Sequence, residues 1–249
     1  MSALCPPGHA EHPGVRCRRF AEDRWVRRRC EDALQRSKAI LAGAGAPTAW
    51  HDQVTSWLFG NGVMTHVLLV AALRNPTVRL RYLRARDVLV AYGHGDLYPE
   101  LLGLLGCAGL TPQRAAEHLV ALGRTFDAAA AALRTPNRFG SDITPAARLI
   151  AIDGSAELIR AGCHRETVFW IAATFARCHA VLALDAPDTR RDLAPAFEAL
   201  LTDLGITSRA GLLRRVEAAI QFLPRLWETA EAIMAANPGL TTRGKVDRR

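Results

Sequence analysis

A single connection in the middle of the chain carries more polar chemistry than the segments around it. The stretch Thr-Pro-Asn-Arg-Phe-Gly-Ser-Asp-Ile at 135–143 breaks the apolar periodicity of the sequence. With the residue before it, this stretch supplies four candidate ligand-binding side chains, which are Arg134, Asn137, Arg138 and Ser141. Arginine binds phosphate and carboxylate groups through charge-assisted hydrogen bonds, and long ordered loops are often functional. The stretch therefore predicts a site for an anionic ligand, with a plain linker that carries helix-capping residues as the alternative.

Four side chains at and after the end of this connection could transfer protons. They are Asp142, Asp153, His164 and Glu166. General acid–base catalysis requires such groups to reach the same substrate, so at least two of them must meet around one cavity. They are the candidate catalytic residues of an alternative function, a small-molecule-modifying enzyme of specialised metabolism that works in a cleft between two helical bundles.

His51 and Asp52 form a further polar pair, beside Trp50 at the start of an expected helix. An imidazole next to a carboxylate can bind a ligand or move a proton. Polar residues in a first helical turn also complement the helix dipole without any other role. We retain both residues as candidate ligand-binding groups.

The chain carries few signs of metal or cofactor chemistry. Cys5, His9, His12 and Cys17 are ligand types that zinc accepts, but their spacing matches no common zinc motif. The sequence has no Gly-rich phosphate loop, no His-Glu-x-x-His and no Gly-x-Ser-x-Gly. We therefore predict no metal site, and the cofactor is left unknown.

The elements that would position these residues are helices along the whole chain. Apolar residues recur with a period near 3.6, and no alternating or β-branched run is bounded by turn residues. We predict an all-α fold of two tandem antiparallel helical bundles. Its expected parts are a flexible basic arm at 1–19, a first bundle at 20–134, a connecting loop at 135–144, a second bundle at 145–236 and a tail at 237–249.

An internal repeat supports this division into two bundles. Nine residues between 96 and 128 are identical to the residues 96 positions later, namely Asp96, Leu97, Pro99, Leu104, Leu105, Gly109, Thr111, Val120 and Phe126. The matches fall at expected helix starts, at a helix-ending glycine and at apolar core positions. Two related bundles would give this pattern, and so would two helix hairpins that acquired similar residues independently.

Composition restricts the classes to which the chain can belong. Apolar residues make up 49% of its 249 positions and charged residues 22%, which excludes a disordered or collagen-like protein. The net charge of +8 comes almost wholly from arginine, and a solvated basic surface explains it more simply than nucleic-acid binding. No secretory segment precedes the six cysteines, and no apolar run reaches the roughly 18 residues that cross a membrane. We expect a cytoplasmic protein that binds neither membranes nor nucleic acid.

Two stretches of the sequence resemble a known helical domain. The first has Thr65-His66-Val67-Leu68-Leu69-Val70, then Arg81-Tyr82, then Tyr98-Pro99-Glu100-Leu101-Leu102, then Leu110-Thr111 before a long helix that ends near Phe126. The second runs from Pro195 to Trp227. Their helix order and apolar pattern resemble the C-terminal helical domain of kanamycin-type nucleotidyltransferases, which is related to HEPN domains, in two tandem copies.

The resemblance implies a helical domain that helps to bind a nucleotide and its acceptor. The catalytic half of that family carries a Gly-Ser followed by Asp-x-Asp, which holds the metal ions. Gly140-Ser141-Asp142 is not followed by such a pair, and no Asp-x-Asp occurs in the sequence. The expected function is therefore to bind a nucleotide or another small anion without nucleotidyl transfer, beside a partner protein that could supply the missing half.

Overall fold

The computed structural model describes residues 20–241 of the chain. The expected arm at 1–19, with Cys5, His9, His12 and Cys17, lies outside the described residues, and so do positions 242–249 of the expected tail. Within 20–241 the chain forms helices and no strand, which confirms the all-α prediction.

Ten α-helices and three shorter helical turns follow one another in the described residues. The α-helices are α2 (Asp23–Gly43), α3 (Trp50–Ala71), α4 (Arg81–Ala91), α5 (Leu97–Leu105), α6 (Pro112–Ala132), α7 (Pro145–Arg148), α8 (Gly154–Arg160), α9 (His164–Asp185), α10 (Pro187–Asp203) and α11 (Arg209–Ala236). The shorter turns are 3₁₀ helices at Val78–Leu80 and Gly140–Asp142 and a π-helical turn at Leu149–Asp153.

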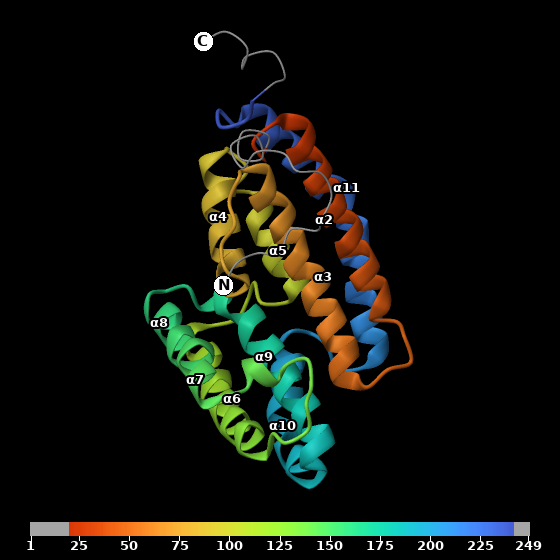
Figure 1. Cartoon of the computed structure of the whole chain (residues 1–249), viewed down its shortest axis with the longest axis vertical. Helices are drawn as coiled ribbons and strands as arrows, with labels where there is room; N and C mark the ends of the chain where they lie inside the picture. Colours follow the sequence, from red (N-terminus) through yellow and green to blue (C-terminus); the bar gives the residue numbers. More distant parts are fainter. Residues whose placement is uncertain (1–19, 242–249) are drawn as a thin grey trace, which may run out of the picture.

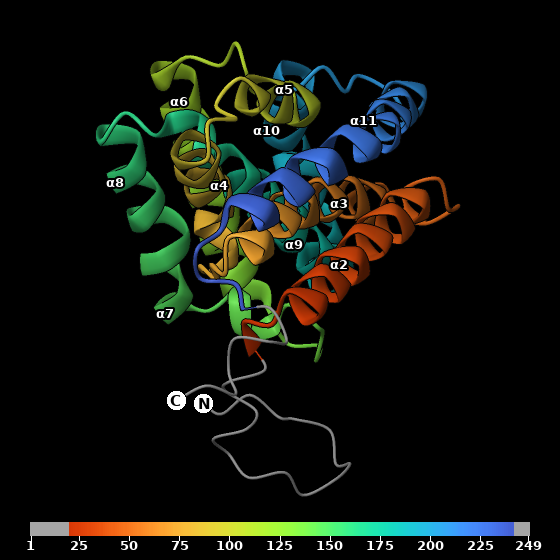
Figure 2. The ribbon, with the colours of Figure 1, turned by 90° about the horizontal axis from the view of Figure 1, so that it is seen from above.

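The helices α3 and α9 form the centre of the molecule. α2 lies along α3, and α11 packs against both of them (Figures 1 and 2). α6, α8 and α10 pack around α9, which also contacts α3. Buried residues of these helices form one continuous hydrophobic core. The helices that carry the candidate site residues are therefore held in place by the same core.

The expected division into two consecutive bundles is not confirmed. α11 belongs to the second expected bundle by sequence, yet it packs against α2 and α3 of the first. α6 belongs to the first expected bundle, yet it packs chiefly against α9. The two halves of the sequence therefore interleave in space, and the connection at 135–144 does not separate two independently packed units.

Two glycines allow α3 to approach its neighbours closely. A Cβ atom at Gly60 would overlap with Cγ of Leu41 on α2, and one at Gly62 would lie 2.8 Å from the ring of Phe169 on α9. The Gly60 carbonyl also accepts a hydrogen bond of 2.9 Å from the Ser37 hydroxyl. The pair of glycines thus marks a point of tight packing inside one uninterrupted helix.

No membrane-spanning segment was expected from the sequence. By length and composition alone, however, α3 and α9 could each cross a membrane. The most apolar 18-residue windows of these helices are 72% and 78% buried inside the molecule. Helices at the centre of a helical core have the same composition, because neighbours cover them on every side. The two helices are therefore only weak evidence for a membrane location.

The two ends of the described chain meet. The Asp23 amide donates to the Thr241 carbonyl over 3.1 Å, and the Thr241 amide donates to the Ala21 carbonyl over 3.0 Å. Nearby, Nδ2 of Asn237 donates to the Ala71 carbonyl at the end of α3. The part of the expected tail that is described, 237–241, is consequently fastened to the starts and ends of core helices.

Candidate functional site

One pocket brings together four of the residues that the sequence analysis selected. It has a volume of about 660 Å³ and lies between the start of α3, the connection after α6 and the last turns of α9. Its walls are formed by Gly43, Thr48, Ala49, His51, Asp52, Ser56, Asn137, Arg138, Phe139, Ala180, Ala183 and Leu184. We call it the α3–α9 pocket.

An ion pair ties the connection to the start of α3. Nη2 of Arg138 lies 2.9 Å from Oδ1 of Asp52, and the Arg138 guanidinium lies 4.6 Å from the centre of the Phe139 ring. The Arg138 side chain is 68% exposed, so the pair contributes little to stability. An anionic ligand could therefore replace the Asp52 carboxylate on Arg138 at small cost to the fold.

His51 is the buried member of the polar pair. Its Nε2 atom lies 3.7 Å from Oδ2 of Asp52, and its Nδ1 atom is buried without a hydrogen-bond partner among the described residues. Burial lowers the pKa of His51; Asp52 opposes this shift, and the charges of Arg190 and Arg138 add to it. The imidazole is consequently neutral near pH 7 and can exchange a hydrogen bond with a ligand.

The connection is anchored to the end of α9. The backbone amides of Arg134 and Thr135 donate to Oδ2 of Asp185 over 2.8 and 3.0 Å, and the Thr135 hydroxyl donates to Oδ1 over 2.6 Å. These hydrogen bonds lower the pKa of the Asp185 carboxyl. One turn later, Oδ1 of Asn137 accepts from the Phe139 amide, whereas its Nδ2 is buried and unpaired in the described structure.

Arg134 and Ser141 do not line the α3–α9 pocket. Arg134 serves the fold through its backbone amide, and Ser141 is exposed in the short helix Gly140–Asp142. Of the six predicted ligand-binding residues, His51, Asp52, Asn137 and Arg138 therefore meet at one cavity, and these two do not.

Arg177, which was not among the predicted site residues, is a buried cation close to the pocket residue Phe139. Its guanidinium lies 4.7 Å from the ring centre of Trp170, 5.4 Å from that of Phe59 and 5.5 Å from that of Phe139. Burial lowers the pKa of Arg177, and the Asp142 carboxylate, 3.3 Å from Nη1, opposes that shift. Phe139 thus contacts two guanidinium groups, those of Arg138 and Arg177. A lone arginine inside the apolar run of α9 was the signal in the sequence.

The four acid–base candidates are held by four different partners. Asp142 pairs with Arg177, and Asp153 lies 3.7 Å from Arg148. His164 contacts the Leu110 carbonyl through Nε2 over 3.0 Å. No hydrogen bond or ion pair joins any two of the four within residues 20–241, and none of the four lines the α3–α9 pocket.

Glu166 belongs to a closed network of its own. Its Oε1 atom accepts from Nη1 of Arg86 over 2.6 Å and from the Tyr98 hydroxyl over 3.0 Å. The carboxylate is nearly fully buried, and desolvation together with this acceptor holds the pKa of Tyr98 well above its usual range. The network fastens α9 to α4 and α5, which is a structural role.

No metal centre is evident in the part of the chain that the structure describes, because no three histidine, cysteine, aspartate or glutamate side chains gather there. The polar groups that line the α3–α9 pocket include the Arg138 guanidinium, the Asp52 carboxylate and the neutral His51 imidazole. Comparison of the chain with family models, with curated proteins and with solved structures gave no match.

Proposed function

We propose that this protein binds a small anionic ligand, such as a nucleotide, in the α3–α9 pocket. The observation that carries the proposal is the meeting of Arg138 with the start of α3 around a cavity of about 660 Å³. That volume lies within the range of roughly 300–1,000 Å³ that small-molecule sites have. Apolar walls with a few polar groups at the rim are also typical of such sites.

The charges around the pocket favour an anion. Arg138 and the positive end of the α3 dipole face it, and Arg190 is close enough to lower the pKa of His51. Asp52 is the one carboxylate in the lining, and it is already paired with Arg138. Phe139, Ala183 and Leu184 offer apolar surface for the uncharged part of the ligand.

The resemblance to nucleotidyltransferase helical domains makes a nucleotide the first ligand to test. The chain lacks the Gly-Ser and Asp-x-Asp pair of that family, so the proposal is binding without nucleotidyl transfer. A partner protein would supply any chemistry that follows. We place this activity in the cytoplasm and involve neither a membrane nor a nucleic acid in it.

A thermal-shift screen of the full chain tests the proposal. The panel contains AMP, ATP with and without Mg²⁺, inorganic phosphate and an aminoglycoside. A ligand at 100 times its dissociation constant stabilises the folded state by about 2.7 kcal/mol. We expect nucleotides to raise the melting temperature and the other compounds to raise it less.

Isothermal titration of the best compound then locates the site. Arg138→Gln should weaken binding by roughly 10- to 100-fold, because a charge-assisted hydrogen bond is lost. Arg124→Gln is the matched control, since Arg124 is exposed on α6 and outside the pocket. Equal affinity of both variants, or silence across the whole panel, would contradict the proposal.

A further inference from the structure

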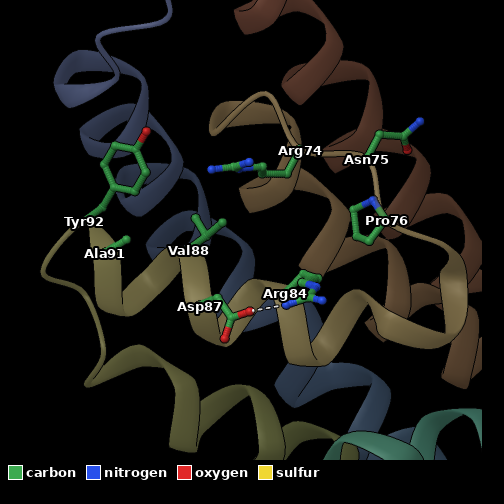
Figure 3. Close-up of a pocket in the computed structure, with 8 residues that line it drawn as sticks. All are labelled: Arg74, Asn75, Pro76, Arg84, Asp87, Val88, Ala91 and Tyr92. Carbon is green, nitrogen blue, oxygen red and sulfur yellow. Dashed lines mark hydrogen bonds and ion pairs between the residues drawn. The ribbon is translucent and has the colours of Figure 1, made fainter.

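A second pocket lies beyond the end of α3, away from the residues discussed so far. It has a volume of about 570 Å³ and sits between α4 and the loop that follows α3 (Figure 3). Its walls are formed by Arg74, Asn75, Pro76, Arg84, Asp87, Val88, Ala91 and Tyr92. We call it the α4 pocket. We propose that it binds a phosphate or carboxylate group carried on a small aromatic ring.

One face of α4 supplies most of the surface. The lining residues of α4 follow the 3–4 spacing that places side chains on one stripe of a helix. Val88 and Ala91 form an apolar floor, the Tyr92 ring stands at one end, and Arg84 and Asp87 stand at the other (Figure 3). An aromatic ring lying on this floor would meet the Tyr92 ring, and its anionic substituent would face the arginines.

The arginines leave the pocket with a net positive charge. Arg84 is paired with Asp87 over 2.9 Å, and both side chains are about half exposed, so an incoming anion can compete with this carboxylate at little cost. The Arg74 side chain extends over the pocket toward Tyr92 (Figure 3). Arg74 is exposed, and within residues 20–241 no carboxylate pairs with it.

A constrained turn places Arg74 over the pocket. Leu73 has φ +56°, and it is the one residue other than glycine with positive φ in the described chain. The Leu73 amide donates to the Val70 carbonyl, and the Arg74 amide donates to the Leu69 carbonyl over 2.7 Å. This is the Schellman arrangement that commonly ends a helix with one left-handed residue, a position where leucine is much rarer than glycine. The turn therefore fixes the backbone that carries Arg74 before any ligand arrives.

Phenyl phosphate is a probe that carries both halves of the proposed ligand. It is titrated calorimetrically into the full chain with Arg138→Gln, so that the α3–α9 pocket contributes little to the signal. We expect measurable binding that is tighter than that of inorganic phosphate or of phenol alone. Adding Arg74→Gln should weaken it at least about tenfold, whereas adding Arg124→Gln should leave it unchanged.

The Tyr92 ring gives a second, independent readout. Tyr92→Phe keeps the ring and should keep the affinity for phenyl phosphate, whereas Tyr92→Leu keeps an apolar side chain without the ring and should weaken binding several-fold. The proposal is overturned if phenyl phosphate does not bind the Arg138→Gln chain, or if Arg74→Gln binds it as tightly as Arg124→Gln. Because Arg138→Gln is present in every chain compared, the difference between Arg74→Gln and Arg124→Gln reports on the α4 pocket whether or not the α3–α9 pocket binds a ligand.

Discussion

At the scale of single residues, the loop side chains were harder to place than the helical ones. His51 and Asp52 lie in the first turn of α3, and their position at the pocket follows from the start of that helix. Arg138 lines the pocket and Ser141 does not, because the direction of each side chain depends on backbone turns that spacing alone does not define. Spacing along the sequence therefore selects residues that meet at one pocket, but it does not separate them from neighbours that lie outside it.

Arg177 shows which signal could have improved the prediction. Its position among apolar residues on α9 predicts burial, and a buried guanidinium needs a counter-charge and polarisable neighbours. The structure provides these as Asp142 and three aromatic rings. The identity of most partners could not be predicted, because all except Trp170 come from two other segments of the chain.

His179 makes a prediction about acid stability. Its ring is buried and stacked 5.0 Å from the Phe197 ring. Burial, reinforced by the charges of Arg190 and His51, lowers the pKa of His179 to about 4, whereas the unfolded chain has a histidine pKa near 6.5. Between these values the unfolded state binds a proton that the folded state does not, so the stability present above pH 6.5 is lost progressively as the pH falls to 4.

The variant His179→Phe should remove this contribution. We expect the free energy of unfolding to fall less steeply on acidification, by about 1.4 kcal/mol per pH unit near pH 5. Urea unfolding curves between pH 4.5 and pH 7 measure the slope for both chains. An unchanged slope would mean that His179 is protonated in the folded state.

At the scale of the elements, the positions of helices follow well from the sequence. Thr111 and Thr144 each precede a proline, which is a typical start of a helix. Their hydroxyls accept hydrogen bonds from the amides three residues later, at the starts of α6 and α7. The π-helical turn at Leu149–Asp153 was not foreseen, because its extra residue leaves no mark on the apolar periodicity.

The internal repeat stays a prediction at this scale. The hydroxyl that caps α6 belongs to Thr111, whereas the one that caps α11 belongs to Ser208, 97 positions later. The second helix of each hairpin, α5–α6 or α10–α11, does contact the first helix of the other hairpin. Arg114 on α6 donates to Asp203 at the end of α10, and Arg215 on α11 donates to the Gly103 carbonyl on α5. Such contacts occur between two hairpins whether or not they share an origin.

Gly62 gives a test of how tightly α3 and α9 pack. Gly62→Ala places a methyl group against the Phe169 ring, and overpacking of this kind costs about 1–3 kcal/mol. Gly103→Ala is the matched control, since nothing lies within 4 Å of a Cβ there and alanine stabilises a helix by roughly 0.5–1 kcal/mol relative to glycine. We expect urea unfolding to show opposite signs for the two variants. A loss at both positions, or at neither, would place the close contact elsewhere.

At the scale of the whole molecule, the return of α11 onto α2 and α3 decides how the chain folds. Periodicity predicts each helix and its apolar face, but it does not say which faces meet. Leu212, Leu226 and Ile233 of α11 are buried in the same core as Trp57 and Leu68 of α3. Which helices pack together is decided by contacts between distant parts of the chain. The apolar periodicity of a single sequence carries no information about these contacts.

This packing predicts one cooperative unfolding transition for the full chain. Two independent bundles would unfold separately, whereas a shared core has to be lost at once. We expect fragments 20–144 and 145–249 to be unfolded or aggregated when they are expressed alone, because each lacks neighbours for its apolar faces. Calorimetry of the full chain and circular dichroism of the fragments measure this. Two resolved transitions, or a folded fragment, would restore the bundle division.

The meeting of the two chain ends has a mechanical consequence. α2 begins and α11 ends beside the hydrogen bonds that join Ala21 and Asp23 to Thr241, and the two helices pack along one another. A force that pulls residues 20 and 241 apart therefore acts on those few bonds first. Once they break, it peels α11 away from α2 one turn at a time instead of shearing the whole interface. A molecule loaded in this way yields at low force from its ends, even though its centre is densely packed.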